Sequence, residues 1–169
     1  MRPPRRRRRE EHSKQNSVIN VVIAGLGGQG VIKASDVLAD AAFRAGLDVK
    51  KSEIHGMSQR GGSVSSDVRF GRGVLSPMVP VGEADFLVVL DSTQVEPNRH
   101  QLKPGGVIIV PELIGDDVLE NKKSLNIALL GALSKHLQIP EADWHVAVKA
   151  SLPEKLHEVN IRAFGAGRR

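Results

Sequence analysis

A glycine-rich loop between an apolar run and an alanine-rich segment constrains the fold of this chain more than any other feature. The run Val18–Ala24 is almost wholly apolar, which is typical of a strand covered on both faces. Val31–Ala45 has apolar residues at helical spacing, and Gly46 stands where a helix would end. The loop between them contains Gly25, Gly27, Gly28, Gln29 and Gly30. A strand, a tight loop and a helix in this order predict an α/β fold.

The Gly-x-Gly-x-x-Gly spacing of this loop is open to three interpretations. Glycines let the backbone approach a phosphate, and the N-terminus of the following helix attracts an anion. A dinucleotide-binding protein would need an acidic residue at the end of the next strand, where Glu53 is a candidate. An adenylating enzyme begins with a similar loop but usually adds a catalytic cysteine or a cysteine-bound zinc. In the third interpretation, the glycines only let the helix pack closely on the strand.

The composition removes several classes of function. The 169 residues suffice for one domain with a sizeable core. The absence of cysteine from the sequence excludes disulfides, thiolate zinc sites, a cysteine nucleophile and cysteine-ligated iron–sulfur clusters. No apolar run is long enough to cross a bilayer, and the charged N-terminus does not resemble a secretory signal. We therefore expect a cytoplasmic protein without membrane contact.

The basic character of the chain is concentrated at its N-terminus. Residues 1–17 carry seven of the 24 Lys and Arg and two of the 19 Asp and Glu, so residues 18–169 have 17 of each sign. We predict a disordered basic tail at 1–17, followed by one domain at 18–169. Because aromatic residues make up only 3% of the chain, nucleic acid is not expected as a partner. The tail is interpreted as an extension that the domain does not need, and an arm that binds nucleic acid or another polyanion is the alternative.

The rest of the chain alternates between strand-like and helix-like segments. The predicted strands are Leu47–Ile54, Ser63–Phe70, Val74–Val79, Phe86–Leu90 and Val107–Val110. The glycines at 71 and 73 suggest that the second and third of these strands form an antiparallel hairpin. Helices are predicted at Thr93–Leu102, stopped by Pro104-Gly105-Gly106, at the amphipathic segment Leu125–Leu137 and at Pro153–Phe164, while 141–150 fits a helix or a strand. The whole pattern predicts a single three-layer α/β/α domain with a mixed, mainly parallel sheet.

A second polar motif follows the strand predicted at Leu47–Ile54. It contains His55, Gly56, Ser58, Gln59, Arg60, Gly61, Gly62 and Ser63. Because both glycine-rich motifs follow strands, we expect them to form one polar surface at the same edge of the sheet. There Arg60 could clamp a phosphate or carboxylate, and His55 could donate a hydrogen bond or transfer a proton. In the alternative interpretation, these residues hold one another and a subunit interface together.

These motifs together resemble the gamma-type subunits of 2-oxoacid:ferredoxin oxidoreductases, and within them the beta subunit of the indolepyruvate type. The resemblance rests mainly on Ile23–Val31 and Glu53–Val64, whose order and spacing are specific. Further similar segments are Gly82–Asp85, Leu102–Gly106, Asn126–Leu133 and Asn160–Phe164. In all, the resemblance runs from about Val18 to Arg168.

The resemblance implies a non-catalytic subunit of a complex that oxidatively decarboxylates a 2-oxoacid to an acyl-CoA and reduces ferredoxin. Larger partner subunits would bind thiamine diphosphate and the iron–sulfur clusters, coenzyme A would bind in the complex, and ferredoxin would be an indirect partner. The sequence agrees, because it lacks both cysteine and a thiamine diphosphate signature (Gly-Asp-Gly, then Asn). We therefore expect no cofactor, metal or catalytic residue on this chain, and the residues of the two motifs are candidates for ligand or interface contacts. Pairing of two copies, and a nucleotide-binding Rossmann-like protein of the NAD-dependent or adenylating kind, stay open as alternatives.

One segment departs from the family pattern. Only Pro111–Leu125 lies between the strand that ends near Val110 and the helix that contains Asn126. Members of the family usually have a few tens of residues more at this point, about one strand and one helix. Any partner or coenzyme A contact made by that missing unit would be absent from this chain.

Overall fold

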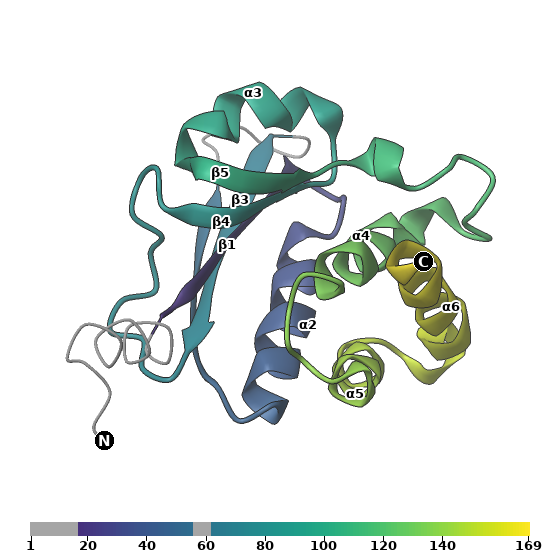
Figure 1. The fold of residues 1–169 in the computed structure, drawn as a ribbon. Helices are drawn as coiled ribbons and strands as arrows, with labels where there is room; N and C mark the ends of the chain where they lie inside the picture. The colour runs from purple at the N-terminus through teal and green to yellow at the C-terminus, as the bar shows by residue number, and fades with distance from the viewer. Residues whose placement is uncertain (1–16, 56–61) are drawn as a thin grey trace, which may run out of the picture.

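A computed structural model of the protein describes residues 17–55 and 62–169. Its centre is a five-stranded sheet (Figure 1), in which the strand order is β2-β3-β1-β4-β5. The strands are β1 Ile19–Leu26, β2 Asp48–His55, β3 Ser63–Gly71, β4 Ala84–Val89 and β5 Leu102–Ile109. Strand β3 is antiparallel to both of its neighbours, whereas β1, β4 and β5 pair in parallel. The prediction of an α/β domain with a mixed, mainly parallel sheet is confirmed.

The longer helices all lie on one side of this sheet. They are α2 Val31–Arg44, α4 Leu125–Ser134, α5 Glu141–Ser151 and α6 His157–Arg168. Helices α2 and α4 contact the strands, while α5 packs on α2 and α6 packs on α4, farther from the sheet (Figure 1). The segment predicted as helix or strand at 141–150 is therefore the helix α5.

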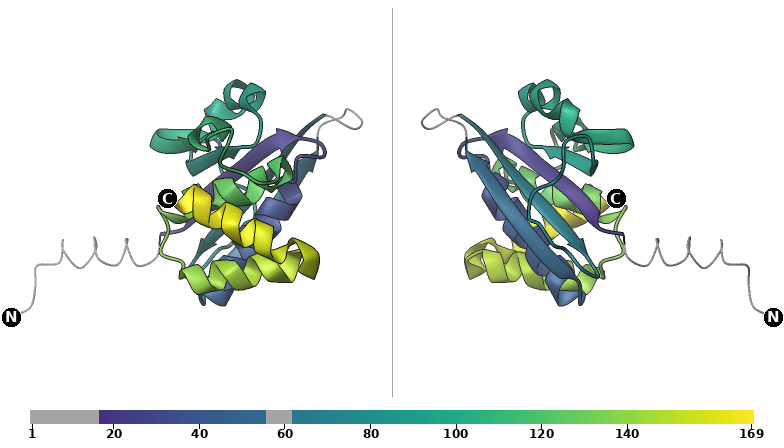
Figure 2. Two further views of the ribbon diagram at one scale, coloured as in Figure 1. Left: turned by 90° about the vertical axis from the view of Figure 1, so that its right-hand side faces the viewer. Right: turned by 90° about the vertical axis from the view of Figure 1, so that its left-hand side faces the viewer.

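The opposite side of the sheet has a much thinner cover. It consists of the short helix α3 Val95–Asn98, flanked by 3₁₀ turns at Ser92–Gln94 and Arg99–Gln101, and of the irregular segment 72–83. Val79 and Val95 pack there against apolar residues of β1 and β4. In the right-hand view of Figure 2, none of the helices formed by the described residues covers β2 and β3 on this side. The three layers are thus unequal, and the predicted helix Thr93–Leu102 is three successive short turns.

Helix α4 is buried on all sides. Nine of its ten residues are buried, because α2, α6 and the sheet enclose it. The prediction of an amphipathic helix at Leu125–Leu137 was wrong in this respect, although its apolar run does form a helix. A helix that is apolar all round is expected when neighbours cover every face.

The predicted hairpin between Ser63–Phe70 and Val74–Val79 is not formed. Strand β3 instead lies between β1 and β2, and 74–79 forms no strand. Two carboxylates bind the backbone of this segment, since Val74 N donates to Asp48 and Val79 N donates to Asp67, at 2.8 and 2.9 Å. Proline at 77 and 80 removes further donors that a strand ladder would need.

Pro104-Gly105-Gly106 does not stop a helix but lies inside the edge strand β5. The register between β4 and β5 pairs Ala84 with Leu102 and Phe86 with Val107, so three extra residues bulge from β5. Gly105 supports the bulge with a φ of +77°, and an edge strand tolerates proline. The proline and glycines at 104–106 therefore belong to a bulge in a strand. The sequence alone does not distinguish such a bulge from a turn.

Other structural predictions are confirmed. Gly46 follows α2 with a φ of +87°, and its N–H donates to the carbonyl of Phe43. The predicted helix at Pro153–Phe164 is a 3₁₀ turn at Glu154–Leu156 followed by α6. Two more 3₁₀ turns, Pro111–Leu113 and Lys122–Ser124, lie between β5 and α4. Residues 1–16 of the predicted tail lie outside the described residues.

Candidate functional site

The first glycine-rich loop joins β1 to α2, as predicted. Gly28 and Gly30 have φ values of +88° and +86°, a region that glycine adopts at little cost. Gln29 N donates to the carbonyl of Leu26 at 3.1 Å, which closes the turn. No side chain among the described residues caps the N-terminus of α2. The N–H groups of its first turn therefore have the partial positive charge that attracts an anion.

The structure brings the end of the second motif against this loop. Gly27 N donates to the carbonyl of Gly62 at 2.8 Å, and Ser63 lies opposite Leu26 in the β1–β3 register. His55 ends β2 at the same edge, opposite Val64 of β3. The two motifs thus meet at one edge, as the topology argument predicted. Gly56, Ser58, Gln59, Arg60 and Gly61 lie outside the described residues, and their roles stay predictions.

The side chain of Gln29 makes two hydrogen bonds within the protein. Its Oε1 accepts the N–H of Leu26 at 2.7 Å, and its Nε2 donates to Oδ2 of Asp91 at 2.9 Å. Oδ1 of Asp91 accepts the backbone N–H of Thr93 at 3.1 Å and its hydroxyl at 2.6 Å. These bonds from Thr93 and Gln29 hold the pKa of Asp91 below its ordinary value. Asp91 therefore links the loop to the end of β4 as a carboxylate.

Asn126 supports the loop from the other side, a contact that sequence reasoning missed. Its Nδ2 donates to the carbonyl of Gly30 at 3.2 Å, although 96 residues separate the two. A Cβ at Gly30 would lie only 2.5 Å from this nitrogen. The signal in the sequence was a polar residue within the otherwise apolar run of α4, and Asn126 is indeed buried.

A cleft of about 540 Å³ opens between the glycine loop and the segment that precedes α4. Among the described residues, the charged side chains that line it are all lysines: Lys33 from the first turn of α2, and Lys122 and Lys123 from the 3₁₀ turn. Lys33 also donates to the carbonyl of Ser151 at 2.9 Å, which fixes its position. Positive charge beside an uncapped helix N-terminus suits a phosphate or another anion.

Glu53, the candidate ribose ligand, does not lie at this cleft. It is on the face of β2 that α2 covers, and its carboxylate accepts from Lys51 Nζ at 2.7 Å. Lys51 also bonds Asp36 of α2. Glu53 thus belongs to an ion-pair network between β2 and α2, which does not fit the dinucleotide interpretation.

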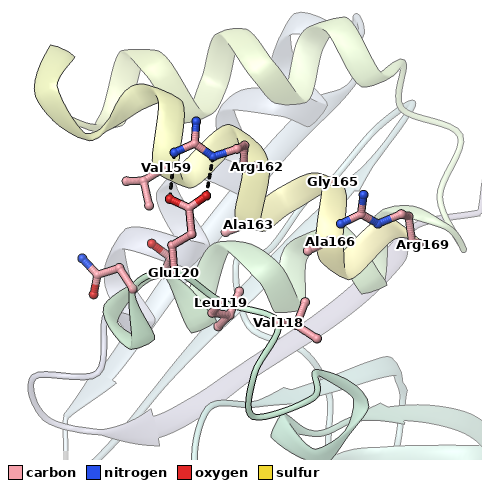
Figure 3. Close-up of a pocket in the computed structure, with 11 residues that line it drawn as sticks. Val118, Leu119, Glu120, Val159, Arg162, Ala163, Gly165, Ala166 and Arg169 are labelled. Atoms are coloured by element: carbon pink, nitrogen blue, oxygen red, sulfur yellow. Dashed lines mark hydrogen bonds and ion pairs between the residues drawn. The ribbon is translucent and has the colours of Figure 1, made fainter.

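A second concave region, of about 250 Å³, lies between the loop before α4 and helix α6 (Figure 3). Glu120 accepts two hydrogen bonds from Arg162, at 2.7 and 2.8 Å, across one end of it. The bond from Arg162 lowers the pKa of Glu120. Because this bidentate pair satisfies both groups, we interpret it as a tie between the loop and α6.

The described residues contain no group of three or more His, Asp or Glu placed to hold a metal ion. None of the helices in this part of the chain is both long and apolar enough to cross a membrane.

Comparison with known proteins places these features in a family. The family described as pyruvate ferredoxin/flavodoxin oxidoreductase matches residues 20–116. Indolepyruvate oxidoreductase subunit IorB of Thermococcus kodakarensis is 33% identical over 88% of this chain and 93% of that protein. The pyruvate/ketoisovalerate oxidoreductases common subunit gamma of Thermococcus litoralis is also 33% identical, over 72% of this chain and 69% of its own length.

Solved structures share the fold. The gamma subunit of a keto/oxoacid ferredoxin oxidoreductase from Geobacter sulfurreducens has a TM-score of 0.72 at 24% identity, covering 89% of this chain and 94% of that one. A 2-oxoglutarate:ferredoxin oxidoreductase from Magnetococcus marinus, solved with 2-oxoglutarate, coenzyme A and succinyl-CoA, has a TM-score of 0.77 at 24% identity. The match covers 90% of this chain but 31% of that longer one.

The relatives also support the predicted internal shortening. The alignment with the Thermococcus kodakarensis protein has 188 positions, whereas 88% of 169 residues is about 149, so about 40 positions lack a counterpart here. The family match ends at residue 116, inside the segment predicted to be short. These relatives are oxidoreductase subunits, which supports the resemblance seen in the motifs and not the Rossmann-like alternative. The chain belongs to the pyruvate ferredoxin/flavodoxin oxidoreductase family.

Proposed function

We propose that this chain is a non-catalytic subunit of a 2-oxoacid:ferredoxin oxidoreductase of the indolepyruvate, pyruvate or ketoisovalerate type. The complex converts a 2-oxoacid and coenzyme A to an acyl-CoA and CO₂, and two electrons pass to ferredoxin. The observation that carries the proposal is the meeting of two family motifs, at Gly27 and Gly62, beside a cleft lined by lysines. A cytoplasmic location remains a prediction.

The residues of this chain do not fit the cofactors of the reaction. Iron–sulfur clusters need cysteine thiolates, and the sequence has none. Nor does the sequence contain a thiamine diphosphate signature. We therefore assign thiamine diphosphate and the clusters to larger partner subunits, with ferredoxin as an indirect partner, and expect the isolated chain to be inactive.

Coenzyme A fits the cleft better than any other component of the reaction. When bound, it supplies the thiol that accepts the acyl group, and its phosphates carry several negative charges. Lys33, Lys122 and Lys123 place three positive charges beside the uncapped N-terminus of α2. These residues would hold the phosphates and so orient the thiol toward the partner subunit.

The second motif follows β2 at the same edge, so we propose that it faces the partner subunit. Arg60 would then bind a phosphate or a carboxylate at the junction, and His55 would donate a hydrogen bond there. This arrangement accounts for polar groups beside the cleft without requiring a catalytic residue on this chain.

The test is reconstitution of the full chain with its thiamine diphosphate subunit, followed by 2-oxoacid-dependent reduction of ferredoxin at varied coenzyme A concentration. Lys122→Glu combined with Lys123→Glu should raise KM for coenzyme A at least tenfold, because two attractive charges become repulsive. KM for the 2-oxoacid should be unchanged, since the partner subunit binds it.

The matched control is Lys135→Glu, at the C-terminal end of α4, which changes an exposed lysine outside the cleft. It should leave KM for coenzyme A within twofold. Equal effects of the cleft and control variants would disprove the coenzyme A assignment. Native mass spectrometry tests the subunit assignment separately, and recovery of a lone chain carrying a nucleotide would rule it out.

A further inference from the structure

Gln29 and Asp91 form a hydrogen-bonded strut under the glycine loop. Leu26 N donates to Gln29, Gln29 donates to Asp91, and Asp91 accepts from Thr93, with N–O distances of 2.7, 2.9 and 3.1 Å. The strut thus connects the end of β1, the loop, and the start of the 3₁₀ turn after β4. Because β1 and β4 are parallel neighbours, it holds the carboxyl ends of two strands together.

The space under the loop is filled, so the strut has little freedom to move. A Cβ at Gly25 would lie 2.8 Å from Cγ2 of Val31, 3.0 Å from Oε1 of Gln29 and 3.1 Å from Cβ of Leu90. Gly25 therefore allows the Gln29 amide to reach the backbone of its own loop. Such close contacts on three sides select one side-chain arrangement.

A loop this rich in glycine needs external support to keep one shape. Glycine residues lose more conformational entropy on ordering than other residues, and Gly28 and Gly30 adopt positive φ. Both amide atoms of Gln29 make hydrogen bonds within the protein, so this side chain contributes to the shape of the loop. The orientation of the N–H groups in the first turn of α2 depends on that shape.

We infer that Gln29 and Asp91 are positioning residues, which hold the loop so that the N-terminus of α2 faces the phosphates of coenzyme A. The inference deepens and rests on the function proposed above. Gln29 is among the residues that line the cleft, and its positioning effect passes through the backbone between Leu26 and Val31.

The strut can be tested by exchanging its amide and its carboxylate between positions 29 and 91. In Gln29→Glu, a second carboxylate faces Asp91 and repels it. In Asp91→Asn, two N–H donors face each other at either Gln29 or Thr93. In the double variant, the carboxylate at position 29 can accept N–H groups from Leu26 and from the new amide at position 91, whose oxygen still accepts from Thr93. The double variant therefore restores every bond with the same total charge.

The expected result is an increase of about tenfold in KM for coenzyme A in each single variant, with a smaller change in kcat. In the double variant KM should return to within about threefold of wild type. Glu96→Gln, which removes an exposed carboxylate from the neighbouring α3, is the charge control and should leave KM unchanged. A double variant no better than the single ones would overturn the inference.

Amide hydrogen exchange at Leu26 in the full chain alone tests the strut without the assay. Exchange should be faster in each single variant and slow again in the double variant. Slow exchange in all of the variants would show that the strut does not hold Leu26 in place. Slow exchange in the double variant without recovery of KM would show that the strut stabilises the loop but does not position coenzyme A, which would overturn the inference. A wild-type complex without coenzyme A-dependent activity would instead disprove the proposed function, and the inferred positioning role with it.

Discussion

At the scale of single residues, the glycine loop contains two positions with the same backbone conformation but different surroundings. Gly28 and Gly30 both have positive φ, yet among the described residues a Cβ at Gly28 would meet nothing within 4 Å, whereas one at Gly30 would meet Asn126. Gly28→Ala should therefore cost about 1–2 kcal/mol, from backbone strain alone. Gly30→Ala should cost about 1 kcal/mol more, because it also breaks the hydrogen bond from Asn126.

Urea unfolding of the two variants beside wild type measures this difference. Gly28→Ala serves as the matched control, since it introduces the same strain without the clash. Equal losses of unfolding free energy would show that Asn126 moves aside without cost, contrary to its proposed support of the loop.

Asp67 gives the molecule a component of stability that depends on pH. It is 5% exposed and accepts the N–H of Val79, and burial raises the pKa of its carboxyl above the ordinary 3.8. Between 3.8 and the raised value the folded state binds more protons than the unfolded state. This contribution to stability is complete below pH 3.8 and is lost as pH rises through the raised pKa.

Asp67→Asn should remove this dependence, because its amide oxygen can still accept from Val79 but does not ionise. The unfolding free energy of the variant minus that of wild type should become more positive from about pH 3.5 to pH 7. Urea unfolding across that range measures it. A constant difference would mean that the carboxyl titrates alike in both states.

Sequence reasoning identified the loop residues but not how they are used. The sequence pattern predicted a strand–loop–helix junction, and the topology argument predicted that the two motifs would lie at the same edge of the sheet, where Gly62 and Ser63 do meet the loop. The sequence made Gln29 a candidate for ligand contact. Its hydrogen-bond partner Asp91 is 62 residues away, and no residue pattern near either position indicates that the two side chains meet. Polar pairs between distant residues form only when helices and strands pack together, and a local residue pattern does not predict that packing.

At the scale of elements, helices α4 and α6 approach so closely that their backbones touch. A Cβ at Gly131 of α4 would lie 2.1 Å from the carbonyl oxygen of Phe164, and one at Gly167 of α6 would lie 1.7 Å from that of Ala128. These contacts are to backbone, which cannot rotate away. Gly167→Ala should therefore separate the helices and cost about 3 kcal/mol.

Gly165→Ala is the matched control on the same helix, because a Cβ there meets no atom of the described residues within 4 Å. Since alanine favours a helix over glycine, this variant should gain up to about 1 kcal/mol. Thermal and urea unfolding compare the two variants. A loss in both would point to local flexibility of α6 rather than to the contact with α4.

Strands were predicted correctly where a residue pattern is compatible with only one kind of secondary structure. The apolar runs in Val18–Ala24 and Phe86–Leu90 became β1 and β4, since only a buried strand fits them. Ser63–Phe70 was correctly extended but was paired with the wrong segment. An alternating pattern predicts a strand but not the strand that pairs with it. The carboxylates of Asp48 and Asp67 accept hydrogen bonds from the backbone of 74–79, the segment that the predicted hairpin would have paired.

At the scale of the whole molecule, we predict that the net positive charge is separate from the folded domain. Residues 18–169 carry 17 positive and 17 negative side chains, so the net charge of +5 comes from residues 1–17. The lysine cleft is therefore a local feature on a neutral domain, and attraction of an anion to it does not depend on the overall charge.

Removal of residues 1–16 tests this separation. The remaining chain should lose retention on a cation exchanger at pH 7 and low salt, with a melting temperature within about 2 °C of the full chain. Replacement of Arg5–Arg9 with glutamine is the control, since it removes most of the charge but keeps the length. A drop of about 5 °C or more in the truncated chain alone would mean that the tail packs on the domain. An equal drop in both variants would mean that its arginines bind the domain, and the charge of the tail would then belong to the folded body.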